Sequence, residues 1–190
     1  NTSDVSVTLL PCLSVGVQGD SRSYKNLVAL SGSHQNWQAL ADIAVEIPKR
    51  CHAVNRVVYA FGDRVTETHF TTATPTVLSR DNVAMLQAAD AIVNEHLLKN
   101  DLLRKLSQVP VVLFPVNFGA GEEPGSPTHS IALRTFITRD FMTGVPAIPG
   151  RDIPEEVLNS IVEQILREVP GVARVCYDLT SKPPATTEWE

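Results

Sequence analysis

The pattern of apolar and polar positions in the first third of the chain predicts a strand, a helix and a second strand. Residues 5–17 alternate loosely and stop at a QGD turn, which is typical of a strand that ends in a tight turn. Residues 36–47 predict a helix, with Asn36 as its cap and Pro48 disturbing its far end. The apolar side chains of this helix share one face: Trp37, Leu40, Ala44 and Ile47. The β-branched and aromatic residues 56–61 predict the second strand.

The last third of the chain repeats this plan. Residues 130–138 predict a strand. Asp152 and Glu155 form a capping signal before a helix, because Asp152 can accept backbone N–H bonds while Glu155 reaches back. The helix that follows has a regular apolar face: Val157, Leu158, Ile161, Val162, Ile165, Leu166 and Val169. Pro-Gly ends this helix, and residues 174–179 predict a closing strand.

The two units also match in sequence, which predicts an internal strand–helix–strand duplication. Residues 54–59 (VNRVVY) align with residues 172–177 (VARVCY). Each unit has an Asp and an Arg at similar spacing: 36 positions from Asp20 to Arg56, and 34 positions from Asp140 to Arg174.

Between the units, residues 81–107 predict a helical region that Asn100-Asp101 interrupts, and residues 109–115 predict a strand. The expected fold class is therefore α+β, with two related strand–helix–strand subdomains, mixed or antiparallel sheets and helices packed on one face. The expected division has three parts: residues 1–80 form the first subdomain, residues 81–130 the connection, and residues 131–190 the second subdomain with a C-terminal tail.

The composition is that of an ordinary globular protein, with 190 residues of which 43% are hydrophobic and 19% charged. The net charge is −5, and residues 1–62, 63–130 and 131–190 carry +1, −3 and −3. No part is basic, so we expect no nucleic acid as a partner. No apolar run reaches the ~18–20 residues of a membrane helix, and we expect neither a signal peptide nor a membrane partner.

The reactive residues do not form a familiar catalytic signature. The three cysteines include no close pair, which favours a reducing compartment and a cytoplasmic location. The five histidines are scattered without ligand spacing, so we expect no metal site. The motifs of P-loops, SGGxDS pyrophosphatases, GxSxG hydrolases and HExxH metalloproteases are missing. Because the chain begins at Asn1 and not at Met, we expect a fragment or a processed product.

Three segments nevertheless carry polar groups suited to a ligand: residues 16–22 (GVQGDSR), 134–146 (RTFITRDFMTGVP) and 178–190 (DLTSKPPATTEWE). A simple turn accounts for the first, and a core strand with an exposed turn accounts for most of the second. The third carries Trp189 next to its end, which predicts that the tail docks on the protein. Two hydroxyls and a cation in this tail suit a phosphate: Thr180, Ser181 and Lys182.

On these segments the sequence resembles the C-terminal part of glutamine-hydrolysing GMP synthetases. The ending DLTSKPPATTEWE is close to the terminal signature of that family, and the strings RTFITRDFMTG, VGVQGDSRSY and VNRVVY match as well. The resemblance covers residues 9–190 and is nearer to the longer form of the family, which has an extra subdomain. The family converts XMP to GMP with ATP and with ammonia from glutamine, in guanine nucleotide biosynthesis.

The resemblance implies that this chain helps to bind XMP and mediates dimerisation. The family's XMP contacts correspond here to five positions: Asp20, Arg22, Gln108, Lys182 and Glu188. Thr180, Ser181 and Arg134 are expected to support them. The phosphate suits Lys182 and Arg22, and the ribose hydroxyls or purine N–H groups suit the carboxylates and Gln108. No catalytic residue is expected in this chain.

The same resemblance implies partners and cofactors outside these 190 residues. ATP and Mg²⁺ belong to the parent enzyme, as do the ATP-pyrophosphatase and glutaminase domains, so the chain alone should be inactive and hold no cofactor. One expectation is a homodimer; the alternative is that the two units form, within one chain and about a pseudo-twofold axis, the contact that joins two chains in the shorter form. Two readings of another class remain open: a duplicated regulatory module that binds a small molecule, and an RNA-binding module, which the negative charge disfavours.

Overall fold

The computed structural model describes residues 4–18, 21–33, 36–66, 72–121, 123 and 125–189. The helices and strands of this part of the chain are, in order, β1 (Ser6–Gln18), β2 (Ser21–Ser31), α1 (Trp37–Arg50), β3 (Val54–Ala60), α2 (Arg80–Lys99), β4 (Val111–Phe114), β5 (His129–Leu133), β6 (Phe136–Ile137), β7 (Val145–Pro146), α3 (Glu155–Glu168) and β8 (Val172–Asp178). None of the helices in the described residues is both long and apolar enough to cross a lipid bilayer.

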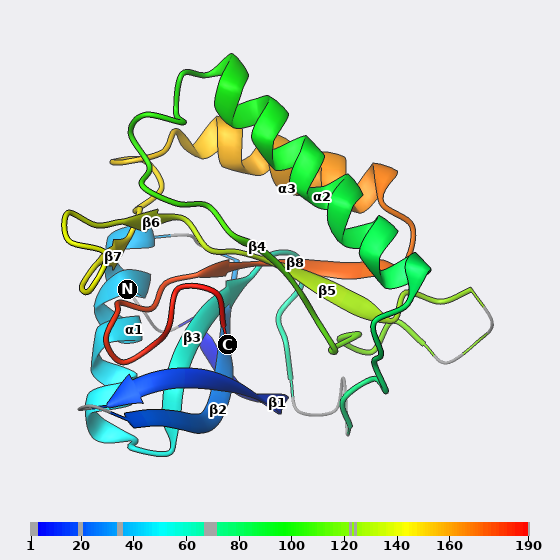
Figure 1. Cartoon of the computed structure of the whole chain (residues 1–190). Helices are drawn as coiled ribbons and strands as arrows, with labels where there is room; N and C mark the ends of the chain where they lie inside the picture. Colours follow the sequence, from blue (N-terminus) through cyan, green and yellow to red (C-terminus); the bar gives the residue numbers. More distant parts are fainter. Residues whose placement is uncertain are drawn as a thin grey trace.

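The described strands form one six-stranded sheet in the order β1-β2-β3-β8-β5-β4, and a separate hairpin of β6 and β7. The pairs β2/β3 and β5/β8 are parallel, each joined through a helix, and the pairs β1/β2, β3/β8 and β4/β5 are antiparallel. The mixed sheet confirms the predicted α+β class (Figure 1).

The two halves of this sheet are related by a pseudo-twofold axis between β3 and β8. Tyr59 pairs with Tyr177, the residue that the sequence match aligns with it. The parallel pairs share their register as well, since Leu27 pairs with Arg56 and Ser130 with Arg174, each just after an irregularity. The duplicated units therefore form one continuous sheet, while the division of the chain at residues 80 and 130 stays a prediction.

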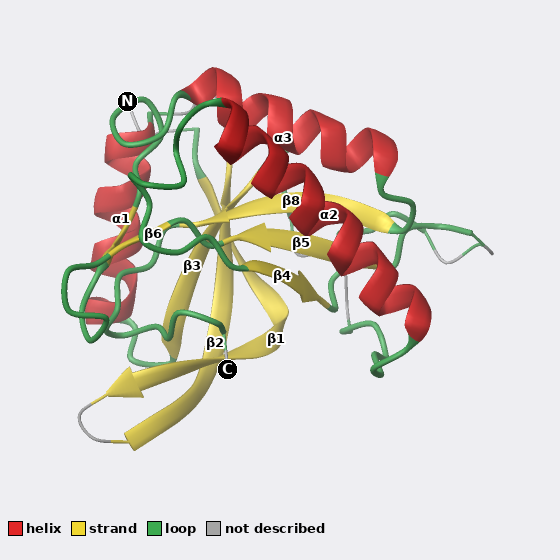
Figure 2. Cartoon of the chain, turned by 45° about the horizontal axis from the view of Figure 1, so that its top comes forward, coloured by secondary structure: helices red, strands yellow, loops and turns green. Residues whose placement is uncertain are grey.

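The helices pack on one face of the sheet, as predicted. Figure 2 shows α1, α2 and α3 on the same side of the strands. Their apolar faces form one core with the strand residues that point to this side, among them Val28, Val57, Ile131 and Val175. Burial of these continuous apolar faces is the main source of stability of such a layered fold.

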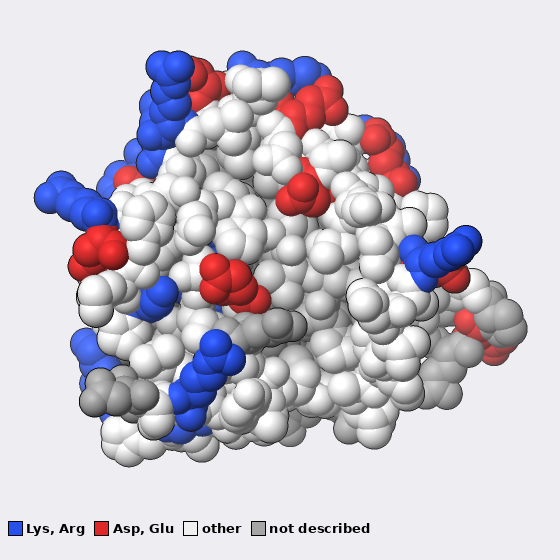
Figure 3. All heavy atoms as spheres, viewed as in Figure 1, with Lys and Arg blue, Asp and Glu red and all other residues white. Residues whose placement is uncertain are grey.

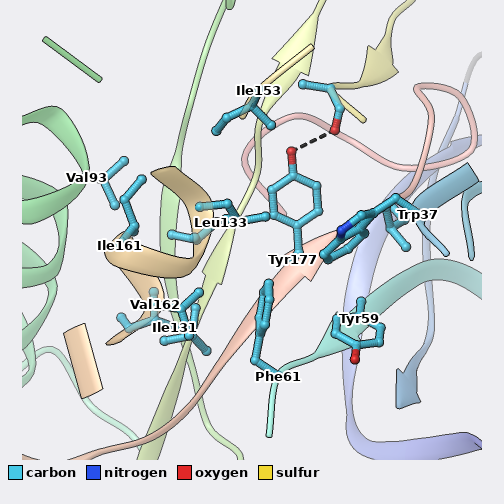
Figure 4. Packing of buried hydrophobic residues seen from close by; sticks show 14 of the residues in the cluster. Trp37, Tyr59, Phe61, Val93, Ile131, Leu133, Ile153, Ile161, Val162 and Tyr177 are labelled. Carbon is cyan, nitrogen blue, oxygen red and sulfur yellow. Dashed lines mark hydrogen bonds between the residues drawn. The ribbon is translucent and has the colours of Figure 1, made fainter. Parts of the chain in front are cut away.

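Aromatic rings fill this core where the two halves meet (Figure 4). The ring centroid of Trp37 lies 5.1 Å from that of Tyr59 and 5.6 Å from that of Tyr177, both in edge-on arrangements. Phe61 lies at the same end of β3, with its ring centroid 5.3 Å from that of Tyr59. Edge-to-face packing of this kind adds to the free energy of burial, so α1 is held against both central strands.

The opposite face of the sheet has no helix over it in the described residues. Its small and apolar side chains, such as Ala29, Val58 and Cys176, are covered by loop residues and by Trp189 near the C-terminus. Trp189 is only 8% exposed, which confirms that the tail docks.

Local signals in the sequence were correct for the start of α1 and the end of α2, whereas Pro48 lies inside α1, which continues to Arg50. The side chain of Asn36 accepts a hydrogen bond from the N–H of Ala39 (3.1 Å), as expected of a helix cap. Helix α2 ends at Lys99, and Asp101 takes a left-handed φ of 54°, so the predicted interruption lies at this point.

Three local predictions were wrong or incomplete. Asp152 does not cap α3: its carboxylate accepts the N–H of Ile148 (2.8 Å) and pairs with Arg151 (2.8 Å), because the chain forms a turn before the helix. The strand predicted over residues 130–138 is divided into β5 and β6, between which the chain leaves the main sheet. Strand β2 was not predicted.

Candidate functional site

The last residues of the chain, 179–189, form a tail that returns from β8 to the edge of the sheet. The N–H of Val17 donates to the carbonyl of Pro184 (2.7 Å), and the N–H of Val15 donates to the carbonyl of Trp189 (3.1 Å). The tail therefore lies beside the second half of β1 and satisfies backbone groups that an edge strand would otherwise leave open.

On its other side the tail contacts the hairpin of β6 and β7. The N–H of Lys182 donates to the carbonyl of Gly144 (2.9 Å), and the N–H of Gly144 donates back to Lys182 (3.0 Å). In Figure 1 the tail, in red, lies between this hairpin and the strands β1 and β2. It thus connects an element of the first half of the chain with an element of the second.

Three buried charged side chains lie beneath the tail; we call them the Arg–Asp cluster. Arg56 contacts one carboxylate oxygen of Asp178 (2.6 Å), and Arg134 lies 3.3 Å from the other. All three side chains are 0% exposed. Two cations and one anion are placed here because β3, β5 and β8 are neighbours in the sheet.

The Arg–Asp cluster holds the tail. Arg56 donates to the carbonyl and the hydroxyl of Thr186 (3.2 and 3.1 Å). The indole N–H of Trp189 donates to Asp178 (2.9 Å), and the guanidinium of Arg56 lies 4.8 Å from the centroid of the Trp189 ring. Hydrogen bonds to buried charged groups are stronger than neutral ones, so these contacts fix the conformation of the tail.

The charges in the cluster persist at neutral pH. Burial by itself raises the pKa of Asp178, but Arg134 and Arg56 outweigh it and hold the pKa below the ordinary value. Burial lowers the pKa of Arg56 to about 10, which still leaves it protonated. Among the described residues, the Nε atom of each arginine has no hydrogen-bond partner, so this buried arrangement carries a cost that the tail contacts must offset.

Two of the predicted XMP contacts lie together on the tail. Lys182 is half-buried, and its ammonium donates to the carbonyl of Phe141 (2.9 Å) and lies 3.4 Å from the hydroxyl of Thr187. Since an ammonium has three N–H groups, the third has no partner in the described part of the chain. Glu188 is exposed between the buried side chains of Thr187 and Trp189.

Arg22 lies close to the tail at the start of β2. It is exposed and is paired with Val17, whose N–H bonds to Pro184 of the tail. Figure 3 shows basic side chains on both sides of an acidic group where the tail passes over β1 and β2. Asp20, the remaining predicted residue of this segment, lies outside the described residues.

Gln108 is farther from the tail. It is exposed, and its backbone pairs with Phe136 of β6 (2.9 and 3.2 Å). Because β7 pairs with β6 and Gly144 with Lys182, the β6–β7 hairpin lies between Gln108 and the tail. Among the described residues, the structure does not bring Gln108 into contact with Arg22, Lys182 or Glu188.

The predicted supporting residues fall into two groups. The Thr180 hydroxyl is buried and bonds to the N–H and the carbonyl of Val57 (2.8 and 3.1 Å), and the buried Arg134 donates to the Thr180 carbonyl. Both therefore act on the position of the tail, and direct contact with a ligand stays only a prediction. Ser181 is half-buried and faces a cavity.

This cavity, of about 460 Å³, lies between the tail and α1. Its lining is mainly apolar: Val17, Ala44, Val45, Pro48, Lys49, Thr180, Ser181, Pro183 and Pro184. The volume is in the range of small-molecule sites, but none of the four predicted XMP contacts that the structure describes lines it. An apolar lining of this kind also does not suit a phosphate.

Of the Arg–Asp cluster, the sequence analysis named Arg134 as a supporting residue and missed Arg56 and Asp178. A signal for Asp178 was present in the repeat, because Ala60 of the first unit aligns with Asp178 of the second. A carboxylate at the end of an otherwise apolar strand indicates a buried partner of opposite charge. In the described residues no group of three or more His, Cys, Asp and Glu side chains is placed to hold a metal ion.

Comparison with known proteins identifies the family of this chain. Residues 95–189 match the family model described as the GMP synthase C terminal domain. The chain belongs to this family. It is 45% identical to the glutamine-hydrolyzing GMP synthase of Dictyostelium discoideum over 199 residues, which cover 97% of this chain and 27% of that protein.

Two further relatives show how the family varies. A probable glutamine-hydrolyzing GMP synthase of Caenorhabditis elegans is 45% identical over 202 residues, covering 100% of this chain and 27% of the relative. The glutamine-hydrolyzing GMP synthase of Borreliella burgdorferi strain N40 is 37% identical, but over only 60% of this chain and 22% of its own length. The chain thus spans about a quarter of the length of these relatives, and part of it has no match in some of them.

Proposed function

We propose that this chain is the XMP-binding C-terminal part of a glutamine-hydrolysing GMP synthase, which makes GMP from XMP, ATP and glutamine. Family membership and the names of the full-length relatives support this proposal. Because the chain spans 27% of the length of those relatives, ATP, Mg²⁺ and the ATP-pyrophosphatase and glutaminase chemistry are assigned to other domains of the same polypeptide. The chain by itself is then inactive.

The observation that carries the proposal is the buried Arg–Asp cluster, which holds a tail that bears the exposed carboxylate of Glu188 and the ammonium of Lys182, one of whose N–H groups has no partner among the described residues. Lys182 has one N–H available for a phosphate oxygen, and Arg22 lies at the adjoining end of β2. Glu188 can accept from ribose hydroxyls or purine N–H groups. Asp20 and Gln108 are further contacts in this proposal, reached when the ligand and the other domains are in place.

The experiment is a substitution of Lys182 by Ala in the full-length enzyme. A charge-assisted contact with a phosphate contributes ~1.5–3 kcal/mol, so the KM for XMP should rise roughly ten- to a hundredfold. Hydrolysis of glutamine should be largely unchanged. Lys49→Ala is the matched control, because Lys49 is an exposed lysine of α1 that pairs with Glu46 of the same helix (3.1 Å). An unchanged KM for XMP in the Lys182→Ala enzyme would contradict the proposal.

We also propose that the pairing of β3 with β8 replaces, inside this chain, the contact that joins two chains in the shorter form of the family. The central position of both strands in the sheet supports this, because each already has a neighbour on both sides. A homodimer of this protein would then use another surface.

A further inference from the structure

The loop that joins β6 to β7, residues 138–144, exposes two large apolar side chains beside the tail; we call it the tip loop. Phe141 is 63% exposed and Met142 is 76% exposed. A single exposed apolar side chain is common on protein surfaces. Two such side chains next to each other are less common, and the loop that carries them has an unusual backbone conformation and contacts Lys182.

The tip loop is held in one conformation by Asp140. Its carboxylate accepts the N–H groups of Met142 (3.0 Å) and Thr143 (2.8 Å), and also the hydroxyl of Thr143 (3.1 Å). These hydrogen bonds hold the pKa of Asp140 below its ordinary value, and the bond from the N–H of Thr143 has the largest effect. The Thr138 hydroxyl accepts the N–H of Phe141 (2.9 Å). The exposed side chains of Phe141 and Met142 thus extend from a loop whose conformation is fixed by hydrogen bonds.

Phe141 has a left-handed backbone, with a φ of 57°. This conformation costs a residue with a β-carbon ~1–2 kcal/mol, and such strained residues gather at sites that bind ligands. Trp189 is also left-handed, with a φ of 72°. Both residues neighbour the segment that carries Lys182 and Glu188, so two of the four left-handed residues other than glycine in the described chain lie at the candidate site; the other two are Asp101 and Phe118.

The tip loop also contacts the ammonium of Lys182, the group that binds the phosphate in the proposed function. The carbonyl of Phe141 accepts a hydrogen bond from Lys182 (2.9 Å), and Gly144 at the end of the loop pairs with the backbone of Lys182. In a nucleoside monophosphate the base lies one ribose away from the phosphate. The Lys182 ammonium bonds to the carbonyl of Phe141, and the exposed ring belongs to the same residue, so a base can reach the ring while the phosphate stays at Lys182.

We propose that Phe141 is a specificity-determining residue: its ring packs on the purine of the nucleoside monophosphate bound at Lys182, and Asp140 is the positioning residue that holds Phe141 there. This inference rests on the proposed function. Stacking of a base on an aromatic side chain contributes to affinity through the π-face of the base. The exposed ring of Phe141 therefore serves to contact the ligand and does not pack in the hydrophobic core.

The test measures the binding of two ligands to the full-length enzyme: XMP, and ribose 5-phosphate, which has the phosphate and the ribose but no base. Stacking is worth ~1–3 kcal/mol per base, so Phe141→Ala should weaken XMP binding roughly five- to 150-fold. Binding of ribose 5-phosphate should not change. Phe141→Tyr should restore XMP binding. Leu78→Ala, which removes a side chain that is 93% exposed before α2, is the matched control and should change neither ligand.

A parallel measurement tests Asp140. Asp140→Ala should lower the affinity for XMP relative to ribose 5-phosphate, as Phe141→Ala does, because the ring is no longer held in place. If Asp140→Ala lowers the melting temperature but leaves the ratio of the two affinities unchanged, its role is only structural and the positioning role is wrong.

The outcomes also separate this inference from the proposed function. Lys182→Ala should weaken both ligands, because both carry the phosphate. If Lys182→Ala weakens both and Phe141→Ala changes neither, the role of Phe141 is wrong and the proposed function stands. If Lys182→Ala changes neither ligand, the proposed function itself is wrong.

Discussion

The two halves of the sheet have the same construction but different contents on the face that lacks a helix. In the first half, β1, β2, α1 and β3 form the unit, and in the second half β4, β5, α3 and β8 form it. The strand registers make Ser31 equivalent to Arg134 and Ala60 equivalent to Asp178. The charged partners that hold the tail are therefore present at these positions in one half and replaced by small residues in the other.

The arginines of the two halves show what this difference does. Arg56 and Arg174 are equivalent in sequence and in register. Arg56 is 0% exposed and pairs with Asp178, whereas Arg174 is half-buried, donates to the carbonyl of Asp63 (2.8 Å) and lies 5.1 Å from the centroid of the Phe118 ring. A duplicated scaffold thus uses the same residue once as a surface contact and once as the centre of a buried site.

The largest expected effect comes from removing each arginine in turn. Arg56→Ala leaves the carboxylate of Asp178 buried with Arg134 alone and releases Thr186, so the free energy of unfolding should fall by ~3–5 kcal/mol. Arg174→Ala loses one partly exposed hydrogen bond and one cation–π contact and should cost about 1 kcal/mol. Urea unfolding of both variants and of the parent chain measures these values.

This pair of variants can also break the comparison. Equal losses of stability would mean that the buried ion pair adds nothing beyond what Arg174 supplies. A change in the slope of the unfolding curve for Arg56→Ala alone would instead show that releasing the tail alters how much surface the native state buries.

The central tyrosines give a smaller effect of the same kind. Tyr177 is fully buried, and its hydroxyl donates to the carbonyl of Ala147 (2.7 Å) and contacts the hydroxyl of Thr135. The Tyr59 hydroxyl donates to the carbonyl of Gly32 (2.9 Å), and this hydrogen bond is only partly buried.

Removing each of these hydroxyls should therefore affect the two halves unequally. Tyr177→Phe leaves a buried carbonyl and a hydroxyl without their partner and should lower the free energy of unfolding by ~1–3 kcal/mol, and Tyr59→Phe by ~0.5–1.5 kcal/mol. The same urea curves measure both. A larger loss for Tyr59→Phe than for Tyr177→Phe would contradict this expectation. It would show that the deeper burial of the Tyr177 hydroxyl does not make its hydrogen bonds more stabilising.

The sequence predicted the elements whose signals are local. The helices α1 and α3 and the strands β3 and β8 were found because their apolar spacing or β-branched content repeats over a few residues. Strand β2 was missed because its first residues, 21–26, are polar and at most half-buried, as they belong to a hairpin at the edge of the sheet. Residues 27–30 (LVAL) are apolar and buried, but this short run follows the polar half of the strand and was not interpreted as a strand.

The residues of the candidate site also differ in whether a local signal in the sequence marks them. Lys182 and Glu188 were named because they stand in a short terminal signature, and their role stays a prediction. The Arg–Asp cluster could not be named, because Arg56 and Asp178 are 122 positions apart and meet only through the pairing of β3 with β8. The division of the strand predicted over residues 130–138 could not be predicted either. The chain leaves the main sheet there and brings the tip loop to the tail, which is a contact between distant parts of the sequence.

The smallest expected effect concerns self-association. In the antiparallel pairing of β3 with β8, Val58 faces Asp178 and Ala60 faces Cys176, so one chain supplies both sides of the contact about the axis. Because β5 pairs with the other side of β8, no edge of β8 remains for a second copy. Sedimentation of the 190-residue chain over the micromolar range should therefore show a mass that does not change with concentration. A tight dimer that is lost when residues 174–179 are altered, while the chain stays folded, would show that the two halves do not satisfy each other within one molecule.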